Sequence, residues 1–214
     1  MDFHYTYIIM AFGLVLTGHF INLIAFTSLI IIHEFGHVIT ATIYKYRIKK
    51  ITIYPYGGIT EFDTLVNTKI EKDLLIAISG IIFQSIYFYT IFFLYRNGII
   101  REYTYNLFFT YHNSMLLFNV LPIIPLDGSK IINLIFSKYL NLNFSNNLTV
   151  LISFITLSMI LIGGIYEKNY SMVMVVFILL QNIWNYYKKM QERYSKVRLL
   201  TWEKEFNYSA INNF

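Results

Sequence analysis

Long apolar runs separated by short polar stretches dominate the chain. A membrane-spanning helix needs about 20 mainly apolar residues. The runs are long enough for about six crossings: residues 7–44, which hold two and turn near 18–22, and then residues 74–95, 104–136, 149–165 and 170–187. The run at 104–136 is overlong and is broken by Pro122, Pro125 and Gly128. This pattern predicts an all-α polytopic membrane protein.

Between the second and third predicted helices the pattern changes to alternation. Residues 51–62 alternate apolar and polar positions around Gly57-Gly58, which predicts a β-hairpin, with Pro55 confined to an edge. Non-helical backbone at membrane depth is tolerated where it lines protein or a water-filled cavity. We therefore expect a membrane-associated hairpin after the second helix. A plain cytoplasmic hairpin without function is the alternative.

Composition and charge agree with a bilayer setting. Apolar residues make up 56% of the chain and charged residues 14%, against the roughly 25% charged residues of a typical soluble domain. The net charge of +5 comes from residues at the ends of apolar runs. With six crossings and a cytoplasmic N-terminus, only Arg96, Arg101 and Lys168 fall outside, which satisfies the positive-inside rule. We expect both termini in the cytoplasm, no removable signal peptide and no direct nucleic-acid partner.

The motif His33-Glu34-Phe35-Gly36-His37 lies inside the first apolar run. Positions i and i+4 of a helix share a face, so both imidazoles can bind one metal while Glu34 projects beside it as a general base. Two histidines satisfied by neighbours in an apolar core are the alternative. An acid and two imidazoles are expensive in hydrocarbon, which favours the metal site.

A third metal ligand is needed, and Asp127 is the candidate. The chain contains no cysteine, so the ligands must come from His, Asp or Glu. A rise of 1.5 Å per residue from Lys45 puts His33 and His37 about 18 and 12 Å from the cytoplasmic surface. The same count from Lys138 puts Asp127 at about 16 Å. The three side chains are thus predicted to lie at one level, unless Asp127 belongs to a turn outside the membrane.

Other polar residues are candidates for substrate binding. Asn119, one to two turns before Asp127, is suited to hold a substrate backbone or a developing oxyanion, or to make an interhelical hydrogen bond. Gly57 and Gly58 are candidates because they sit at the hairpin turn. We expect His112 to be a packed or interfacial histidine.

These motifs resemble the site-2 protease family of intramembrane metalloproteases, and within it the sporulation proteases of endospore formers. The resemblance rests on the motif helix, on Leu126-Asp127-Gly128 and on three further stretches: 16–19, 55–58 and 119–138. It implies Zn²⁺ bound by His33, His37 and Asp127, with Glu34 as catalytic acid and base. Residues 1–187 would form the intramembrane metalloprotease domain, and residues 188–214 a cytoplasmic tail, either amphipathic or solvated.

The resemblance also implies a biological setting. The substrate would be a membrane-associated pro-sigma factor of the pro-sigma-K type, and the location the mother-cell membrane around the forespore. Inhibitory membrane proteins would be possible partners beside the lipid bilayer. Two features depart from the pattern: Ser129 replaces a common second glycine, and the 27 residues after Tyr187 are too short for the CBS domain of the related proteases. With these departures the resemblance does not extend to regulation through nucleotide sensing or to the identity of the substrate.

Two other classes of function compete with a protease. A transporter or ion pathway would use the intramembrane carboxylates of Glu34 and Asp127 as relays, but it leaves the histidine pair unexplained. A non-catalytic scaffold would keep the same residues as a structural metal centre. Metal content and a Glu34→Gln activity test separate the three.

Overall fold

Helices make up most of the protein in the computed structural model, which describes residues 2–55, 57–62 and 69–211. In chain order the elements are β1 (Asp2–Phe3), α1 (Tyr5–Leu16), α2 (Phe20–Ile43), β2 (Ile48–Tyr54), β3 (Gly57–Phe62), α3 (Ile70–Arg96), α4 (Glu102–Val120), α5 (Asp127–Tyr139), α6 (Leu142–Tyr166) and α7 (Tyr170–Ile211). The mainly helical prediction is confirmed.

Among the described residues, three helices are long and apolar enough to cross a membrane: α2, α3 and α6. Helix α1 has only 12 residues. The predicted run at 104–136 divides into α4 and α5, because Pro122 and Pro125 lack the backbone N–H that a continuous helix requires. The count of six crossings stays a prediction, and so does the division at residue 187, which falls within α7.

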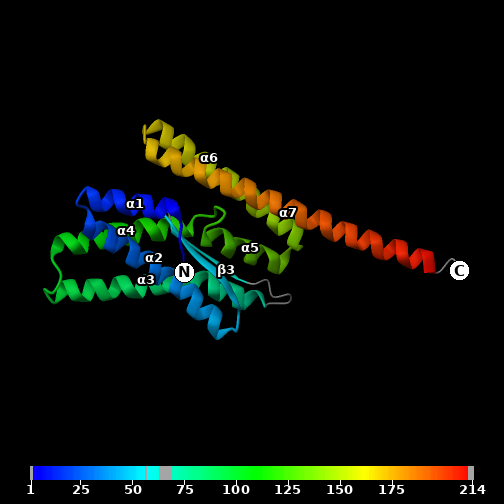
Figure 1. The fold of residues 1–214 in the computed structure, drawn as a ribbon, viewed down its shortest axis with the longest axis horizontal. Coiled ribbons are helices and arrows are strands. Elements are labelled where there is room, and N and C mark those ends of the chain that lie inside the picture. Colours follow the sequence, from blue (N-terminus) through cyan, green and yellow to red (C-terminus); the bar gives the residue numbers. More distant parts are fainter. Residues whose placement is uncertain (1, 56, 63–68, 212–214) are drawn as a thin grey trace.

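Helix α2 lies at the centre of the first half of the molecule, packed against α1, α3, α4 and the strands. Figure 1 shows α6 and α7 as an antiparallel pair along one side of the other helices, with α7 extending beyond them. Leu29 and Ile30 of α2 are fully buried, in a core cluster that includes Tyr7, Ile53 and Met115. A second cluster packs the 121–126 connection against α6 and α7. This connection thereby fixes where α5 begins.

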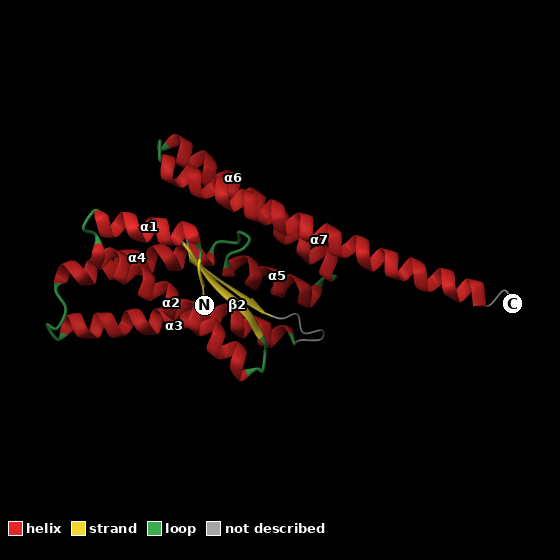
Figure 2. Ribbon diagram, in the orientation of Figure 1, coloured by secondary structure: helices red, strands yellow, loops and turns green. Residues whose placement is uncertain are grey.

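A three-stranded sheet in the order β1-β2-β3 covers part of α2 (Figure 2). Strands β2 and β3 form an antiparallel pair from Ile48 to Phe62, where alternation predicted a hairpin. The sequence analysis did not predict β1, which pairs parallel to β2 at Thr52 and Ile53. Two residues are too short for an alternating pattern. Because β1 pairs with β2, β3 forms the other edge of the sheet.

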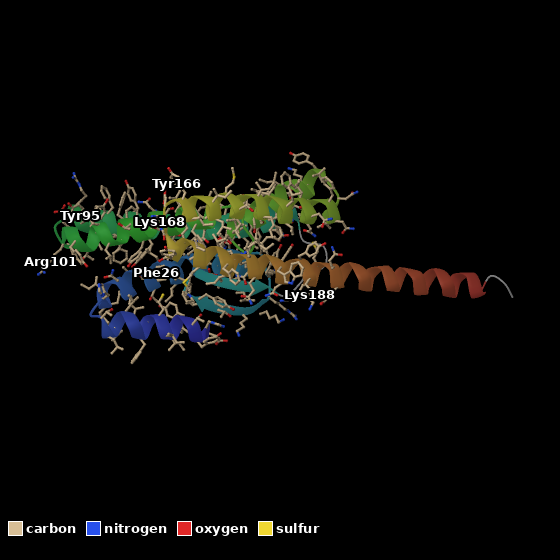
Figure 3. The ribbon with its side chains drawn as sticks, turned by 90° about the horizontal axis from the view of Figure 1, so that it is seen from above. Phe26, Tyr95, Arg101, Tyr166, Lys168 and Lys188 are labelled. Carbon is tan, nitrogen blue, oxygen red and sulfur yellow. The ribbon has the colours of Figure 1, made fainter. Side chains whose placement is uncertain are left out.

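The labelled basic residues are separated along the long axis. Figure 3 shows Arg101 and Lys168, together with Tyr95 and Tyr166, toward one end, and Lys188 near the middle, where α7 leaves the other helices. This separation is what the predicted topology requires, since it assigns Arg101 and Lys168 to the outside and Lys188 to the cytoplasm. The orientation of the termini relative to a membrane remains a prediction.

Candidate metal centre

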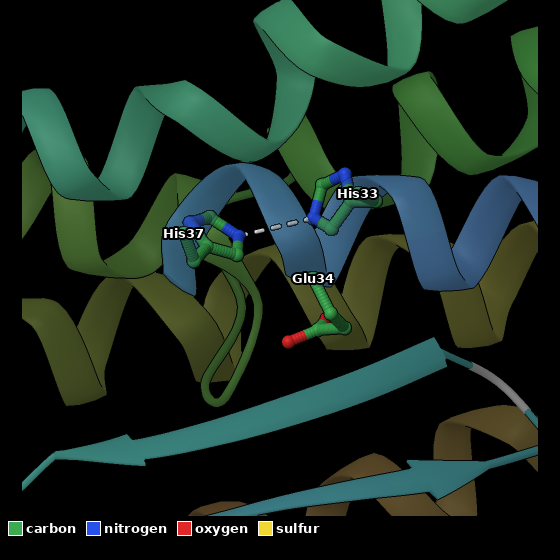
Figure 4. Close-up of side chains that lie close together, drawn as sticks. All are labelled: His33, Glu34 and His37. Atoms are coloured by element: carbon green, nitrogen blue, oxygen red, sulfur yellow. Dashed lines mark hydrogen bonds between the residues drawn. The ribbon is translucent and has the colours of Figure 1, made fainter. Parts of the chain in front are cut away.

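The two motif histidines face each other along one side of α2 (Figure 4). Their Nε2 atoms are 3.2 Å apart, and both side chains are buried. Asp127, the first residue of α5, brings its Oδ2 atom to 2.9 Å from His33 Nε2 and 3.0 Å from His37 Nε2. The three residues predicted to share one depth therefore meet in space.

Hydrogen bonds on the far side of each imidazole determine which ring nitrogen carries the proton. His37 Nδ1 lies 2.7 Å from the carbonyl oxygen of Ile76, which can only accept, so Nδ1 donates. His33 Nδ1 lies 3.1 Å from Gln84 Oε1, which also accepts. In the neutral histidines both Nε2 atoms consequently present lone pairs to each other and to Asp127 Oδ2.

This donor set fits a metal ion. Two imidazole lone pairs and a carboxylate oxygen within 3.2 Å of one another repel unless a cation or protons lie between them. A catalytic zinc takes three protein ligands of the His and carboxylate type and keeps one position open. The side chains of His33, Glu34 and His37 also form a cluster that could hold a metal ion.

Gly80 of α3 leaves space beside the ligand atoms. A Cβ atom at this position would contact His37 Nε2 and would lie 2.8 Å from His33 Nε2. Any side chain here would therefore occupy the space against both nitrogens. Such a cradle, which a single methyl group would fill, is a second observation that the residues present fit a bound ion.

Asp127 is held by its own helix as well as by the histidines. Its Oδ1 atom accepts a hydrogen bond from Lys130 Nζ at 2.9 Å, one turn further along α5. This leaves Oδ2 directed at the two Nε2 atoms. A carboxylate in the first turn of a helix is also favoured by the helix dipole. The first residue of α5 thus presents the third candidate ligand.

The carboxylate of Glu34 is buried and points toward β3 (Figure 4). Its Oε2 atom accepts a hydrogen bond from Thr60 Oγ1 at 2.5 Å. Gly58 lies so close that a Cβ atom there would collide with the Glu34 carboxylate. The hairpin therefore passes directly across the predicted general base.

Of the three candidates for substrate binding, only one contacts the site. Of the two turn glycines, Gly58 contacts Glu34, whereas Gly57 lines a separate cavity of about 220 Å³ with Phe26 and Tyr111. Asn119 is half-buried in the last turn of α4. No side-chain hydrogen bond of Asn119 to the site occurs in the part of the chain that the structure describes.

Sequence analysis missed two residues at the centre, Gln84 and Thr60. Gln84 is fully buried, and Thr60 is buried against Glu34. A large amide in the apolar run at 74–95 was a signal that could have identified Gln84, because polar side chains are costly in the bilayer. Thr60 had no such signal, since threonine is ordinary in a strand.

A cavity of about 370 Å³ adjoins the centre. His37, Thr60 and Lys130 line it near the candidate metal ligands, and Asn133 and Tyr186 line it further away. The lining is mainly apolar with a few polar groups, as is typical of sites that bind organic ligands. It lies between helices α3, α5, α6 and α7 and is large enough for a short peptide segment.

The chain is similar to known proteins in sequence. Residues 21–107 match the profile of peptidase family M50. The chain is 33% identical over 136 residues to stage IV sporulation protein FB of Bacillus subtilis, covering 64% of this chain and 47% of that protein. It is 27% identical over 149 residues to zinc metalloprotease MJ0392 of Methanocaldococcus jannaschii, covering 68% and 43%. The chain spans less than half the length of these curated relatives.

The fold is also similar to that of a solved structure. A site-2 protease from Methanocaldococcus jannaschii matches with a TM-score of 0.68 and 23% identity, covering 86% of this chain and 88% of that one. At this identity the likeness shows the fold alone. The chain is thus similar in sequence to peptidase family M50 and to two of its proteases, and it has the fold of a site-2 protease.

Proposed function

We propose that the protein is an intramembrane zinc endopeptidase with His33, His37 and Asp127 as ligands and Glu34 as general base. The observation that carries the proposal is the convergence of His33 Nε2, His37 Nε2 and Asp127 Oδ2 within 3.2 Å inside an apolar helical protein. The similarity to peptidase family M50 and to a zinc metalloprotease of Methanocaldococcus jannaschii supports it.

The residues around the centre have separate tasks. A bound zinc would supply a Lewis acid that polarises the peptide carbonyl and acidifies water. The Glu34 carboxylate takes the proton from the attacking water and returns it to the leaving amine. Thr60 Oγ1, which donates to Glu34 Oε2, holds this carboxylate in place, and Lys130 does the same for Asp127.

The β3 edge is suited to hold the substrate. A peptide bond inside a helix is shielded by its own hydrogen bonds, so the scissile segment must become extended and find new partners. Strand addition supplies them. Since β1 pairs with β2 on one side, the edge available to a substrate is β3, whose Gly58 and Thr60 contact Glu34.

We propose that the substrate is a membrane-associated pro-sigma factor of the pro-sigma-K type. The similarity to stage IV sporulation protein FB supports this choice and the mother-cell membrane as its location. In this proposal both termini lie in the cytoplasm, and residues 1–187 form the protease domain. Inhibitory membrane proteins are proposed as further partners. The distribution of basic residues supports this topology.

The test is co-expression with candidate pro-sigma factors, with processing followed as a shift on a gel and bound zinc measured after purification. Glu34→Gln should keep zinc, because the amide is close in size, and should lose at least about a hundredfold in cleavage. Glu71→Gln, at an exposed position in the first turn of α3, is the matched control and should cleave normally.

Each rival function has its own outcome in this experiment. A transporter would show neither stoichiometric zinc nor processing. A scaffold would hold zinc without turnover in the wild type. Cleavage by Glu34→Gln near the wild-type rate would show that another group is the base.

A further inference from the structure

A buried hydrogen-bonded chain links three helices behind the candidate metal centre. Gln84 of α3 stands between His33 of α2 and His112 of α4. Gln84 is fully buried, and the two histidines are 2% and 7% exposed. Within the described residues, Gln84 supplies the only side-chain hydrogen bond to His33 Nδ1. Gln84 and His112 lie behind the candidate ligand His33 and do not contact Glu34.

The orientation of the Gln84 amide is determined by its partners. Gln84 Nε2 lies 3.1 Å from the backbone carbonyl oxygen of His112, which can only accept, so this end of the amide must be the NH₂ group. The same NH₂ group donates to His112 Nδ1 at 3.1 Å. The oxygen Oε1 is thereby turned toward His33 Nδ1, 3.1 Å away.

This arrangement selects one tautomer of His33. An amide oxygen opposite Nδ1 requires the proton on Nδ1, which leaves the lone pair on Nε2, the nitrogen that faces His37 and Asp127. The other neutral tautomer would point an N–H at the ligand cluster and would oppose metal binding. Partners behind a ligating histidine typically contribute 10- to 100-fold in metal affinity.

The His112 end of this hydrogen-bonded series is held by two contacts. The His112 ring stacks on Phe88, with centroids 4.4 Å apart and an interplanar angle of 4°. Phe88 lies one turn after Gln84 on α3. Because the NH₂ group of Gln84 also bonds the His112 backbone, the amide keeps one anchor when the imidazole is removed.

We infer that Gln84 is a positioning residue that fixes the tautomer and orientation of His33 for metal binding, with His112 holding the Gln84 amide. The inference rests on the proposed function only in requiring a metal at His33. A purely structural glutamine, which bridges helices by hydrogen bonds, would affect stability and leave the metal affinity of the folded protein unchanged.

The experiment measures the affinity of purified, metal-free protein for Zn²⁺ alone, by competition with a chelator, and the visible spectrum of the Co²⁺ form. Gln84→Met keeps length and loses the acceptor, so zinc affinity should fall about 10- to 100-fold and the Co²⁺ spectrum should change. Gln84→Glu keeps an acceptor for His33 but loses the donor to His112, so its affinity should lie between those of Gln84→Met and the wild type. His112→Leu should lose less than Gln84→Met.

Gln181→Met is the matched control, because Gln181 is exposed on α7, and it should bind as the wild type does. A folded Gln84→Met protein with wild-type affinity and spectrum overturns the inference. If Gln84→Met does not fold, ¹⁵N-histidine NMR of the zinc-loaded wild type decides. Metal on His33 Nε2 with Nδ1 protonated supports the inference, and metal on Nδ1 overturns it.

The results also distinguish this inference from the proposed function. A wild type that binds zinc, beside an unchanged Gln84→Met, removes the role of Gln84 and leaves the protease proposal intact. A wild type that binds no zinc overturns both.

Discussion

Gly80→Ala adds one methyl group beside the candidate ligands and should remove most metal binding. The new Cβ atom would contact His37 Nε2 and would lie 2.8 Å from His33 Nε2 and 2.6 Å from His37 Cε1. Gly80 is buried in the middle of α3, which packs closely on α2. The methyl group therefore cannot turn away, and the imidazoles must move.

The size of the effect follows from these distances. Ordinary contact between such atoms is near 3.5 Å, so His33 Nε2 must shift by about 0.7 Å. Metal-ligand distances tolerate only about 0.2 Å. Overpacking of this kind costs about 1–3 kcal/mol. If the metal-bound state carries that cost, zinc affinity falls between about 5- and 150-fold.

The assay is zinc affinity of the detergent-purified protein by chelator competition, with folding checked by gel filtration. Gly163→Ala is the matched control: it is also a helical glycine in an apolar helix, and a Cβ atom there meets nothing within 4 Å. It should bind zinc as the wild type does. Folded Gly80→Ala protein with unchanged zinc affinity would refute the assigned geometry of the centre.

Three further predictions use the same preparations. Asp127→Ala should lose bound zinc, and full occupancy after purification without added zinc would exclude it as a ligand. Thr60→Val removes the donor to Glu34 and should reduce cleavage about 10- to 150-fold with normal zinc, because a hydrogen bond to a charged group contributes about 1.5–3 kcal/mol. Unchanged cleavage contradicts its role. Since the chain has no cysteine, cysteines at Asn97 and Lys168 should label from outside and one at Lys50 only after permeabilisation. Reversed labelling would invert the topology.

The candidate ligands could be predicted from local pattern. His33 and His37 share a helical face through their spacing alone. Asp127 could be added because it is an acidic residue in an apolar run, and because counting residues from the flanking lysines put it at the same depth. Hydropathy and spacing carry this information without knowledge of the tertiary structure.

The surroundings of the ligands could not be predicted in the same way. Gln84 is 51 positions from His33 and 28 from His112, so its role depends on how α2, α3 and α4 pack. In the sequence Gly80 is likewise only a small residue in an apolar helix, and its role becomes visible only when the packing of α3 on α2 is known. Such contacts between distant segments have no periodic signal in a single sequence.

The N-terminal strand explains why α1 is shorter than a membrane span. Helix α1 is about 18 Å long at 1.5 Å per residue, against about 30 Å for the hydrocarbon core. It starts directly after β1, which belongs to the sheet that lies across Glu34. Glu34 is nine residues before the end of α2, about 14 Å along the helix. In the proposed topology, which puts Ile43 at the cytoplasmic surface, α1 needs to cover only the remaining distance.

The proposed membrane insertion also requires water at the depth of Glu34, the candidate general base. Lys50 and Asp2 form an ion pair of 3.4 Å on the sheet, and their side chains are 50% and 63% exposed. Lys50 pairs with Glu61, next to Thr60, so this ion pair lies at the level of Glu34. Charges and strand backbone at such a depth are tolerated only beside a water-filled recess. With α2 inserted as proposed, the sheet therefore borders water on the side away from α2, and hydrolysis at Glu34 can draw on it.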